Sequence, residues 1–294
     1  MAPTQQVPHL QDYGSLSANR PPPAPGTRKP RVSMVTIVLN SANTVERTIR
    51  TVQEQTFQDI EHIVIDGGST DGTQDLLAKL LRPQDYWISE RDRGISDAFN
   101  KGIALARGEF IQFINADDWM ELNQVELAVA ALDRSGADFV FGDLLFYQDG
   151  VPTFRYHGDP DYGRKLSRFM PAMNHPTVLA RISAFKRIGL FNFNYKCAME
   201  YDWFLRLHRS GGVGVHDPSI LGHMTHDGIS NVQFRRTIDE VRRISVAHGR
   251  PAVLAAMEAF VRRGKTTLGF RVKRHAFPLY QFIRANINRS YSRI

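Results

Sequence analysis

The sequence predicts an α/β fold whose central sheet is mostly parallel and is flanked by helices. The first observation is a β-branched apolar run at residues 32–39, which suits a strand buried on both faces. The second is an alternation of strand and helix patterns with short connections, which is typical of a doubly wound sheet. The other strands are expected at residues 60–65, 86–89 and 110–114, and the helices at residues 43–55, 73–81 and 96–106.

The pattern changes after about residue 135. Strands separated by turns are expected at residues 137–141, 144–147 and 153–156, then helices at 183–188, at 198–209 and from 233 onward. Seven of the fifteen prolines lie within residues 1–30, so we expect a disordered leader there, with too little apolar surface to fold. The remaining chain divides into a globular domain over residues 31–235 and a basic helical extension over residues 236–294.

Composition excludes several classes of protein. The single cysteine, Cys197, leaves no partner for an intrachain disulfide and no cysteine-based zinc cluster. The sequence contains no apolar run of roughly 18 residues, so we expect no transmembrane helix. Residues 1–30 also lack the apolar stretch of a signal peptide, and a cytoplasmic location is therefore expected.

The formal net charge of +7 is concentrated near the C-terminus. Residues 244–294 contain ten Lys or Arg residues and one acidic residue, Glu258. Aromatic residues are interspersed with these basic ones, so residues 265–294 are predicted to bind an anionic membrane surface, which would make the protein peripheral on the inner face of the cell membrane. The alternative is that this helix packs its apolar face on the domain.

Polar clusters follow the predicted strands at the edge where ligands of such sheets bind. Asp66 opens the segment DGGSTDG, which suits either a close backbone approach to a ligand or an ordinary strand-to-helix turn. Asn115, Asp117 and Asp118 follow the strand at residues 110–114. Adjacent carboxylates at such a position favour Mg²⁺ or Mn²⁺, unless one of them only caps the next helix.

A third acidic cluster lies on the predicted helix at residues 198–209. Glu200 and Asp202 are two positions apart, so only one of them is expected to face a site, where it could act as a general base. Together the three clusters predict nucleotide recognition, a metal on a diphosphate and a separate base. This combination suits the displacement of a nucleoside diphosphate from a sugar carbon.

Six segments of the chain resemble glycosyltransferase family 2, of the inverting GT-A class. They are residues 36–40 (TIVLN), 55–57 (QTF), 66–73 (DGGSTDGT), 87–90 (WISE), 93–102 (RGISDAFNKG) and 115–118 (NADD). The resemblance covers roughly residues 32–235 and is closest to bacterial enzymes that build capsular or exopolysaccharide repeat units. It implies transfer of a sugar from a UDP- or GDP-linked donor to a saccharide or polyprenyl-linked acceptor.

The resemblance also implies roles for the matching residues. Residues 31–118 would bind the nucleotide-sugar donor, and residues 119–235 would form the acceptor side. Glu200 would be the catalytic base, with Asp202 as the substitute candidate because the family commonly has Asp where this chain has Glu200. The metal, Mn²⁺ or Mg²⁺, would be held by Asp117 and Asp118. Donor contacts would come from Leu39, Asn40, Asp66, Asp97, Asn115 and His226.

Two competing functions fit the sequence less well. A sugar-nucleotide nucleotidyltransferase should carry a Gly-rich, basic phosphate loop after the first strand, where this chain has neither glycine nor lysine at residues 39–43. A non-enzymatic nucleic-acid-binding protein should present basic and aromatic residues on its sheet, whereas these strand ends are acidic. We therefore expect no nucleic-acid partner.

Overall fold

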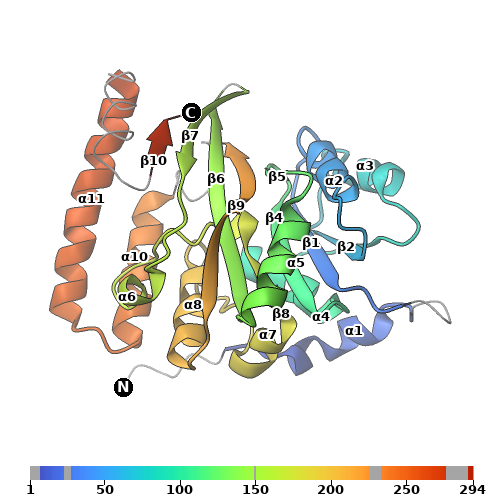
Figure 1. The fold of residues 1–294 in the computed structure, drawn as a ribbon, viewed down its shortest axis with the longest axis horizontal. Coiled ribbons are helices and arrows are strands. Elements are labelled where there is room, and N and C mark those ends of the chain that lie inside the picture. Colours follow the sequence, from blue (N-terminus) through green and yellow to red (C-terminus); the bar gives the residue numbers. More distant parts are fainter. Residues whose placement is uncertain (1–6, 23–27, 149, 226–232, 276–290, 294) are drawn as a thin grey trace.

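The computed structural model describes residues 7–22, 28–148, 150–225, 233–275 and 291–293. One mixed sheet runs through the molecule, and helices lie on both sides of it (Figure 1). The strands are β1 (Val32–Val38), β2 (Ile60–Asp66), β3 (Tyr86–Ser89), β4 (Phe110–Asn115), β5 (Trp119–Met120), β6 (Phe139–Gln148), β7 (Val151–Tyr156), β8 (Leu179–Arg181), β9 (Gly214–Thr225) and β10 (Tyr291–Arg293). The main path across the sheet is β10-β7-β6-β8-β4-β1-β2-β3, and β9 pairs with β5 and β6.

The helices cover the sheet and form a further layer at one end of it. They are α1 (Gly14–Asn19), α2 (Val45–Gln53), α3 (Thr73–Leu80), α4 (Ile95–Leu105), α5 (Gln124–Ser135), α6 (Tyr162–Leu166), α7 (Ile182–Ile188), α8 (Met199–Arg209), α10 (Phe234–Ala247) and α11 (Ala252–His275). Short 3-10 helices occur at Leu10–Tyr13 and His175–Thr177.

The sheet is parallel in its first half and mixed in its second. The neighbours β4, β1, β2 and β3 all pair in parallel, as the alternating pattern predicted. Alternate residues of these strands enter two separate cores, with Val35 facing α4 and Met34 facing α5. Because β1, β2 and β4 are parallel and in register, Val38 lies beside Asp66 and Ile37 beside Asn115. The polar clusters that follow these strands therefore meet at one edge of the sheet.

The second half differs from the sequence-based expectation at β6. A turn was predicted between residues 141 and 144, but β6 continues through Gly142 as one strand. Gly142 marks a close approach of β9 instead, because a Cβ atom there would lie 1.9 Å from the carbonyl oxygen of Ile220. The glycine therefore serves packing rather than chain reversal.

The expectation of a disordered leader at residues 1–30 is wrong for residues 7–22. This segment forms a 3-10 helix and α1, and Leu10, Tyr13 and Leu16 pack against the main core. Two polar side chains fix it further. The buried hydroxyl of Tyr13 donates to Asp97 at 2.7 Å, and the buried guanidinium of Arg20 pairs with Glu61 at 2.7 Å. Such single contacts leave no trace in composition.

The predicted division at residues 235 and 236 does not match a structural boundary. It falls inside α10, whose buried Glu240 accepts hydrogen bonds from the backbone of Lys196, Cys197 and Ala198. The described C-terminal residues are also not all helical, because β10 pairs antiparallel with β7. Within the described residues, no helix combines the length and apolar character needed to span a bilayer.

Candidate active site

The loops that follow β1 and β2 form one rigid unit at the sheet edge. The backbone N–H of Asn40 donates to Ser69 Oγ at 2.7 Å, and the Asn40 side chain accepts from the backbone of Thr70 at 3.0 Å. Asn40 has a φ of 50°, a left-handed conformation that asparagine tolerates better than most residues. These and two further hydrogen bonds fix the backbone of residues 39–42 against residues 67–73. The Leu39 side chain is 58% exposed.

Asp66 lies beneath this unit rather than on its surface. Its carboxylate is fully buried and accepts hydrogen bonds from the backbone of Gly68 and Ser69 and from the hydroxyls of Ser69 and Ser89. A carboxylate with four donors already in place is not free to accept from a bound base. The geometry therefore does not support direct base recognition by Asp66, and it indicates that Asp66 shapes the loop.

A different carboxylate, which the sequence analysis missed, lies next to the exposed part of this loop. Asp92 Oδ2 is 2.7 Å from the position that a Cβ atom on Gly67 would occupy, and Leu39 Cδ1 is 3.4 Å from the same point. The other oxygen of Asp92 accepts from the backbone of Gly94 at 2.7 Å, which orients the side chain. Leu39 and Asp92 thus lie together against Gly67 and combine an apolar surface with a carboxylate.

Asp97 is directed into the protein. Its carboxylate accepts from the hydroxyl of Tyr13 and from the backbone and guanidinium of Arg93, at 2.7 to 3.1 Å. Burial disfavours ionisation, but these hydrogen bonds outweigh it and lower the pKa of Asp97. The predicted donor contact of Asp97 is therefore not supported, and Asp97 instead holds the loop before α4 in place.

The predicted metal site lies after β4 and contains a buried carboxylate with an unsatisfied oxygen. Asp118 Oδ2 accepts from the side-chain amide of Asn115 at 3.1 Å, whereas Asp118 Oδ1 has no hydrogen-bond partner among the described residues. Burial, and then the charge of Asp117, raise the pKa of Asp118 well above its ordinary value. A buried carboxylate in this state requires a cation or a proton.

This donor set suits a hard divalent cation that keeps open coordination positions. Mg²⁺ commonly uses one or two protein carboxylates together with phosphate oxygens and water. In the described part of the chain, no group of three or more His, Cys, Asp or Glu residues could hold a metal alone. Asp117 and Asp118 are thus the two protein carboxylates that such an open site would need.

A basic residue that the sequence analysis missed stands beside these carboxylates. Arg47 of α2 donates to the carbonyl oxygen of Asp117 at 2.9 Å, and its guanidinium lies 3.6 Å from the centre of the Trp119 ring. The stacking and the hydrogen bond fix the direction of an otherwise exposed side chain. Arg47 thus adds a positioned positive charge where an anionic ligand would meet the metal.

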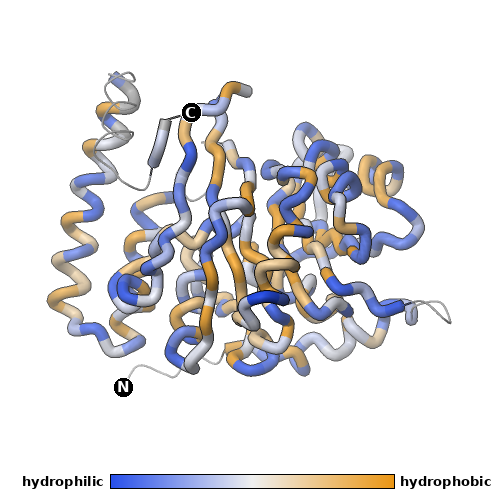
Figure 2. Tube along the Cα trace, in the orientation of Figure 1, coloured by the Kyte–Doolittle hydropathy of each residue, from blue (hydrophilic) through white to orange (hydrophobic). Residues whose placement is uncertain are grey.

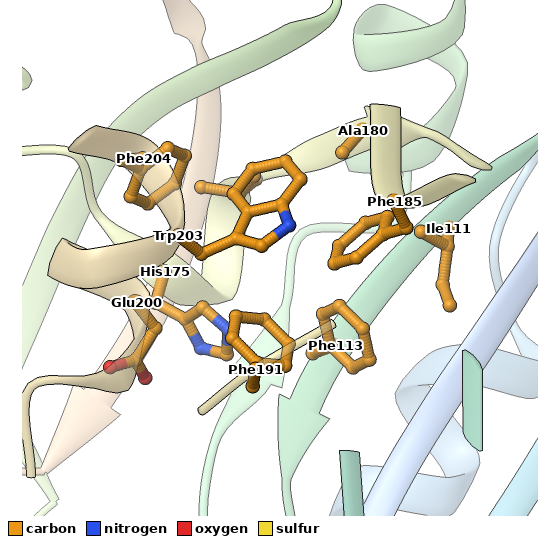
Figure 3. A pocket seen from close by; sticks show the side chains of 10 residues that line it. Ile111, Phe113, His175, Ala180, Phe185, Phe191, Glu200, Trp203 and Phe204 are labelled. Atoms are coloured by element: carbon orange, nitrogen blue, oxygen red, sulfur yellow. The ribbon is translucent and has the colours of Figure 1, made fainter. Parts of the chain in front are cut away.

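Glu200 lies in the first turn of α8, at the edge of a small aromatic cavity (Figure 3). Phe113, Phe191 and Trp203 line the interior together with His175, and the Glu200 carboxylate points away from these rings at the cavity edge. Burial, with a smaller repulsion from Glu240, raises the pKa of Glu200 to about 7. Phe113 belongs to β4, two residues before Asn115, so this cavity and the metal candidates adjoin the same strand end.

The pKa of Asp202 is lowered, whereas that of Glu200 is raised. The buried Asp202 carboxylate pairs with Arg206 at 2.9 Å and with His248 at 3.4 Å. Burial alone would raise the pKa of Asp202, but His248 and Arg206 lower it. Asp202 is therefore a structural ion-pair partner, and this geometry removes it as the substitute base. His226, the remaining predicted site residue, lies outside the described residues.

His175 is the polar neighbour of Glu200 in the cavity. Burial lowers the pKa of His175 to about 4, so its ring is neutral near pH 7 and supplies no positive charge to the carboxylate. Among the described residues, His175 Nε2 has no hydrogen-bond partner. His175 therefore does not offset the effects of burial and of Glu240, which together keep the pKa of Glu200 in a range that suits a general base near neutral pH.

The model of Glycosyl transferase family 2 matches residues 33–191, which is more than half of the chain. The chain belongs to glycosyl transferase family 2. A PGL/p-HBAD biosynthesis glycosyltransferase from Mycobacterium bovis is 31% identical over 186 residues, covering 60% of this chain and 69% of the relative. The family that the sequence motifs indicated is therefore confirmed.

Solved structures confirm the predicted GT-A fold. S. aureus TarS 1–349 in complex with UDP-GlcNAc gives a TM-score of 0.58 at 17% identity, covering 86% of this chain and 79% of that one. A mannosyltransferase from Pyrobaculum calidifontis, in complex with GDP-Man and Mn²⁺, gives 0.59 at 18% identity, covering 85% and 76%. The chain spans 47% of the longer TarS structure. At these identities the likeness concerns the fold alone.

Proposed function

We propose that this glycosyltransferase transfers a sugar from a UDP- or GDP-linked donor to a saccharide or polyprenyl-linked acceptor, with inversion at the anomeric carbon. The observation that carries the proposal is that two acidic residues in unusual states lie near the end of β4. The pKa of Glu200 is raised to about 7, and one carboxylate oxygen of Asp118 has no hydrogen-bond partner among the described residues. One group is suited to accept a proton and the other to bind a cation. In a single displacement at a sugar carbon, the base activates the acceptor hydroxyl and the cation stabilises the leaving group.

The donor nucleotide is proposed to bind over the loops after β1 and β2. The base would pack on the exposed Leu39 side chain, and Asp92, which lies against Gly67, would accept a hydrogen bond from the base or the ribose. Asn40 supports this surface through its bonds to Ser69 and Thr70. The structural neighbours carry UDP-GlcNAc and GDP-Man, which supports a UDP- or GDP-linked donor for this chain.

The diphosphate is proposed to lie beside Asp117 and Asp118, which would hold Mn²⁺ or Mg²⁺. The neighbour that contains Mn²⁺ supports this assignment, as does the unsatisfied oxygen of Asp118. The metal, when bound, neutralises the charge that develops on the leaving nucleoside diphosphate. Arg47 would add a second positive charge from α2, and Asn115 would orient Asp118 through its amide.

Glu200 is proposed to take the proton from the acceptor hydroxyl as that oxygen attacks the anomeric carbon. The bond from the sugar to the diphosphate breaks on the opposite side, so the configuration inverts. A pKa near 7 keeps the carboxylate basic enough to help attack and largely ionised just above neutrality. The PGL/p-HBAD relative supports a role in glycolipid or polysaccharide synthesis. The cytoplasmic side of the membrane is the proposed location.

A donor panel tests this proposal directly. The protein would be incubated with UDP- and GDP-sugars in Mn²⁺, Mg²⁺ or EDTA, and release of nucleoside diphosphate and transfer to polyprenyl-linked saccharides would be measured. We expect turnover of at least one donor with metal and little in EDTA. In a parallel incubation with added pyrophosphate, formation of UTP or GTP together with a sugar 1-phosphate would indicate a nucleotidyltransferase instead. A product that retains the donor's anomeric configuration would contradict the single displacement.

A further inference from the structure

Helix α11 presents large apolar side chains to solvent. Among the described residues, ten large hydrophobic side chains are exposed, and six of them lie on this one helix. The most exposed are Phe260 at 79% and Val253 at 71%, and the others are Leu254, Met257, Val261 and Leu268. Figure 2 shows several apolar segments along α11, which stands at the outer end of the molecule (Figure 1). Such a concentration exceeds the scattered exposed apolar residues of an ordinary surface.

The face of α11 that packs on the domain is small and ionic instead. Ala255 and Ala259 are its buried residues. Glu258 forms ion pairs with Arg250, which lies just before α11, and with Arg168, which follows α6. The guanidinium of Arg262 lies 4.2 Å from the centre of the Phe169 ring. The helix therefore already has its contact with the domain, through alanines and ion pairs. Residues 276–290 of the predicted segment 265–294 lie outside the described residues, so both alternatives for that segment stay predictions.

The exposed residues form a continuous stripe. Val253, Met257, Phe260 and Leu268 recur at helical spacings of three, four and eight residues, which places them on one side. Lys265 and Arg271 are exposed on the same stretch. Glu258 is the only acidic residue within Ala252–His275, and its charge is compensated by Arg250 and Arg168. The outer surface of α11 is thus apolar and basic together.

We propose that this outer face of α11 docks the enzyme on an anionic lipid surface. Apolar side chains would enter the boundary between headgroups and acyl chains, and Lys265 and Arg271 would meet anionic headgroups. A second copy of the chain is a poorer occupant, because a symmetric contact would place two basic stripes against each other. An anionic bilayer supplies both the apolar layer and the opposite charge.

Co-sedimentation of the full chain with lipid vesicles tests this docking. Vesicles of phosphatidylcholine alone would be compared with vesicles that also contain phosphatidylglycerol, at low and high salt. We expect binding only to the anionic vesicles and weaker binding at high salt. Since each basic residue near an anionic surface contributes about fivefold, the double variant Lys265→Glu, Arg271→Glu should bind more than tenfold more weakly.

The apolar stripe is tested by Met257→Ser, Phe260→Ser. This variant should also lose more than tenfold in vesicle binding, because its side chains no longer enter the interface. Its matched control is Val151→Ser, Val213→Ser, which removes two equally exposed apolar side chains from β7 and from the loop before β9. The control should bind like the parent. Equal binding by the α11 variant and the parent would overturn the proposal, as would absence of binding at low salt.

A reporter at the stripe separates lipid from other occupants. The parent already contains three tryptophans, so the signal is the emission of Phe260→Trp after the parent's emission is subtracted. This difference emission should shift to shorter wavelength only when anionic vesicles are added. A blue-shifted difference emission without vesicles would mean that another part of the chain covers the stripe. A sedimentation-velocity dimer that Phe260→Ser dissociates would identify a second copy as the occupant. Either result would contradict docking on lipid.

Discussion

The ends of β2 and β4 each bury a carboxylate, and the two carboxylates are in opposite states. Asp66 and Asp118 are 0% and 1% exposed, so neither can rely on water to stabilise its charge. Asp66 has four donor groups around it, whereas Asp118 has a single amide and the repelling charge of Asp117. The protein itself supplies the hydrogen-bond donors that the Asp66 carboxylate needs. The second carboxylate has an oxygen without a hydrogen-bond partner among the described residues, which a cation or a proton would satisfy.

The same difference separates the two acidic residues of α8. Asp202 is held by Arg206 and His248, while no side chain among the described residues donates a hydrogen bond to Glu200. We infer that carboxylates saturated by the protein hold the fold, and that unsaturated ones are kept for ligands or protons. Residue type and spacing do not reveal this distinction, because both kinds lie in the same short motifs.

The largest expected effect comes from the incomplete carboxylate after β4. Asp118→Asn should lower turnover by about 10³-fold or more, because cation stabilisation of the leaving group is worth several kcal/mol. The same substitution should leave the melting temperature unchanged or raise it, since it removes an uncompensated buried charge. Turnover with a nucleotide-sugar donor and thermal unfolding without metal measure the two effects. Substantial activity of Asp118→Asn, or of Asp117→Ala, would contradict the metal assignment.

Glu200→Gln is the next largest change. Loss of a positioned general base costs about 10²–10⁴-fold in turnover, while donor binding should remain nearly intact. Asp202→Asn is the matched control two residues away. It should keep turnover but lower stability by about 3 kcal/mol, because it breaks a buried ion pair. If Asp202→Asn were inactive while folded and Glu200→Gln active, the two roles would be exchanged.

The raised pKa of Glu200 also predicts two opposite dependences on pH. Turnover should rise with pH with an inflection near 7, since only the ionised carboxylate accepts a proton. Stability should show the reverse sign. The folded state binds this proton more tightly than the unfolded state, so this contribution to stability is lost as pH rises from about 4.5 to about 7. Glu200→Gln should remove both dependences, which pH–rate profiles and melting curves can check.

Asp66→Asn should affect stability more than chemistry. The NH₂ group of the new asparagine would face backbone and hydroxyl donors that now bond to the carboxylate. Losing these hydrogen bonds should lower the free energy of unfolding by about 2 kcal/mol. Urea unfolding measures the change. The contrast with Asp118→Asn is the direct test of the comparison, since the same substitution should destabilise one strand end and not the other. Equal effects at both sites would contradict the distinction between complete and incomplete carboxylates.

Much of the fold was predictable because its signals are local. The strands at residues 32–39, 60–65 and 110–114 and the helices between them follow from apolar patterns. β9 was missed because Gly214–Thr225 mixes exposed polar residues with only a few buried ones, and its pairing with β6 is distant in sequence. Gly142 was misinterpreted for a related reason, since only the partner strand shows why glycine is needed there.

The candidate site was predictable in its location but not in the roles of its residues. The motif after each strand placed Asp66, Asp117 and Asp118 at the correct edge, because parallel strands end together. Which carboxylates are saturated depends on donors from elsewhere, such as Ser89 for Asp66 and His248 for Asp202. Arg47 and Asp92 had no motif to mark them, and only tertiary contacts reveal that they adjoin the site.

The smallest expected effect concerns Asp97, whose carboxylate accepts a hydrogen bond from the N-terminal segment. Tyr13→Phe removes one hydroxyl donor, but the backbone and guanidinium of Arg93 remain bonded to the carboxylate. Stability should therefore fall by only about 1 kcal/mol, or about 2 °C in melting temperature. The control is Tyr147→Phe, whose hydroxyl makes no hydrogen bond within the described residues, and it should melt like the parent. A loss of turnover in folded Tyr13→Phe at saturating donor would show that residues 7–22 do more than supply a hydrogen bond to Asp97. Asp97 would then fit neither the structural nor the reactive group of carboxylates.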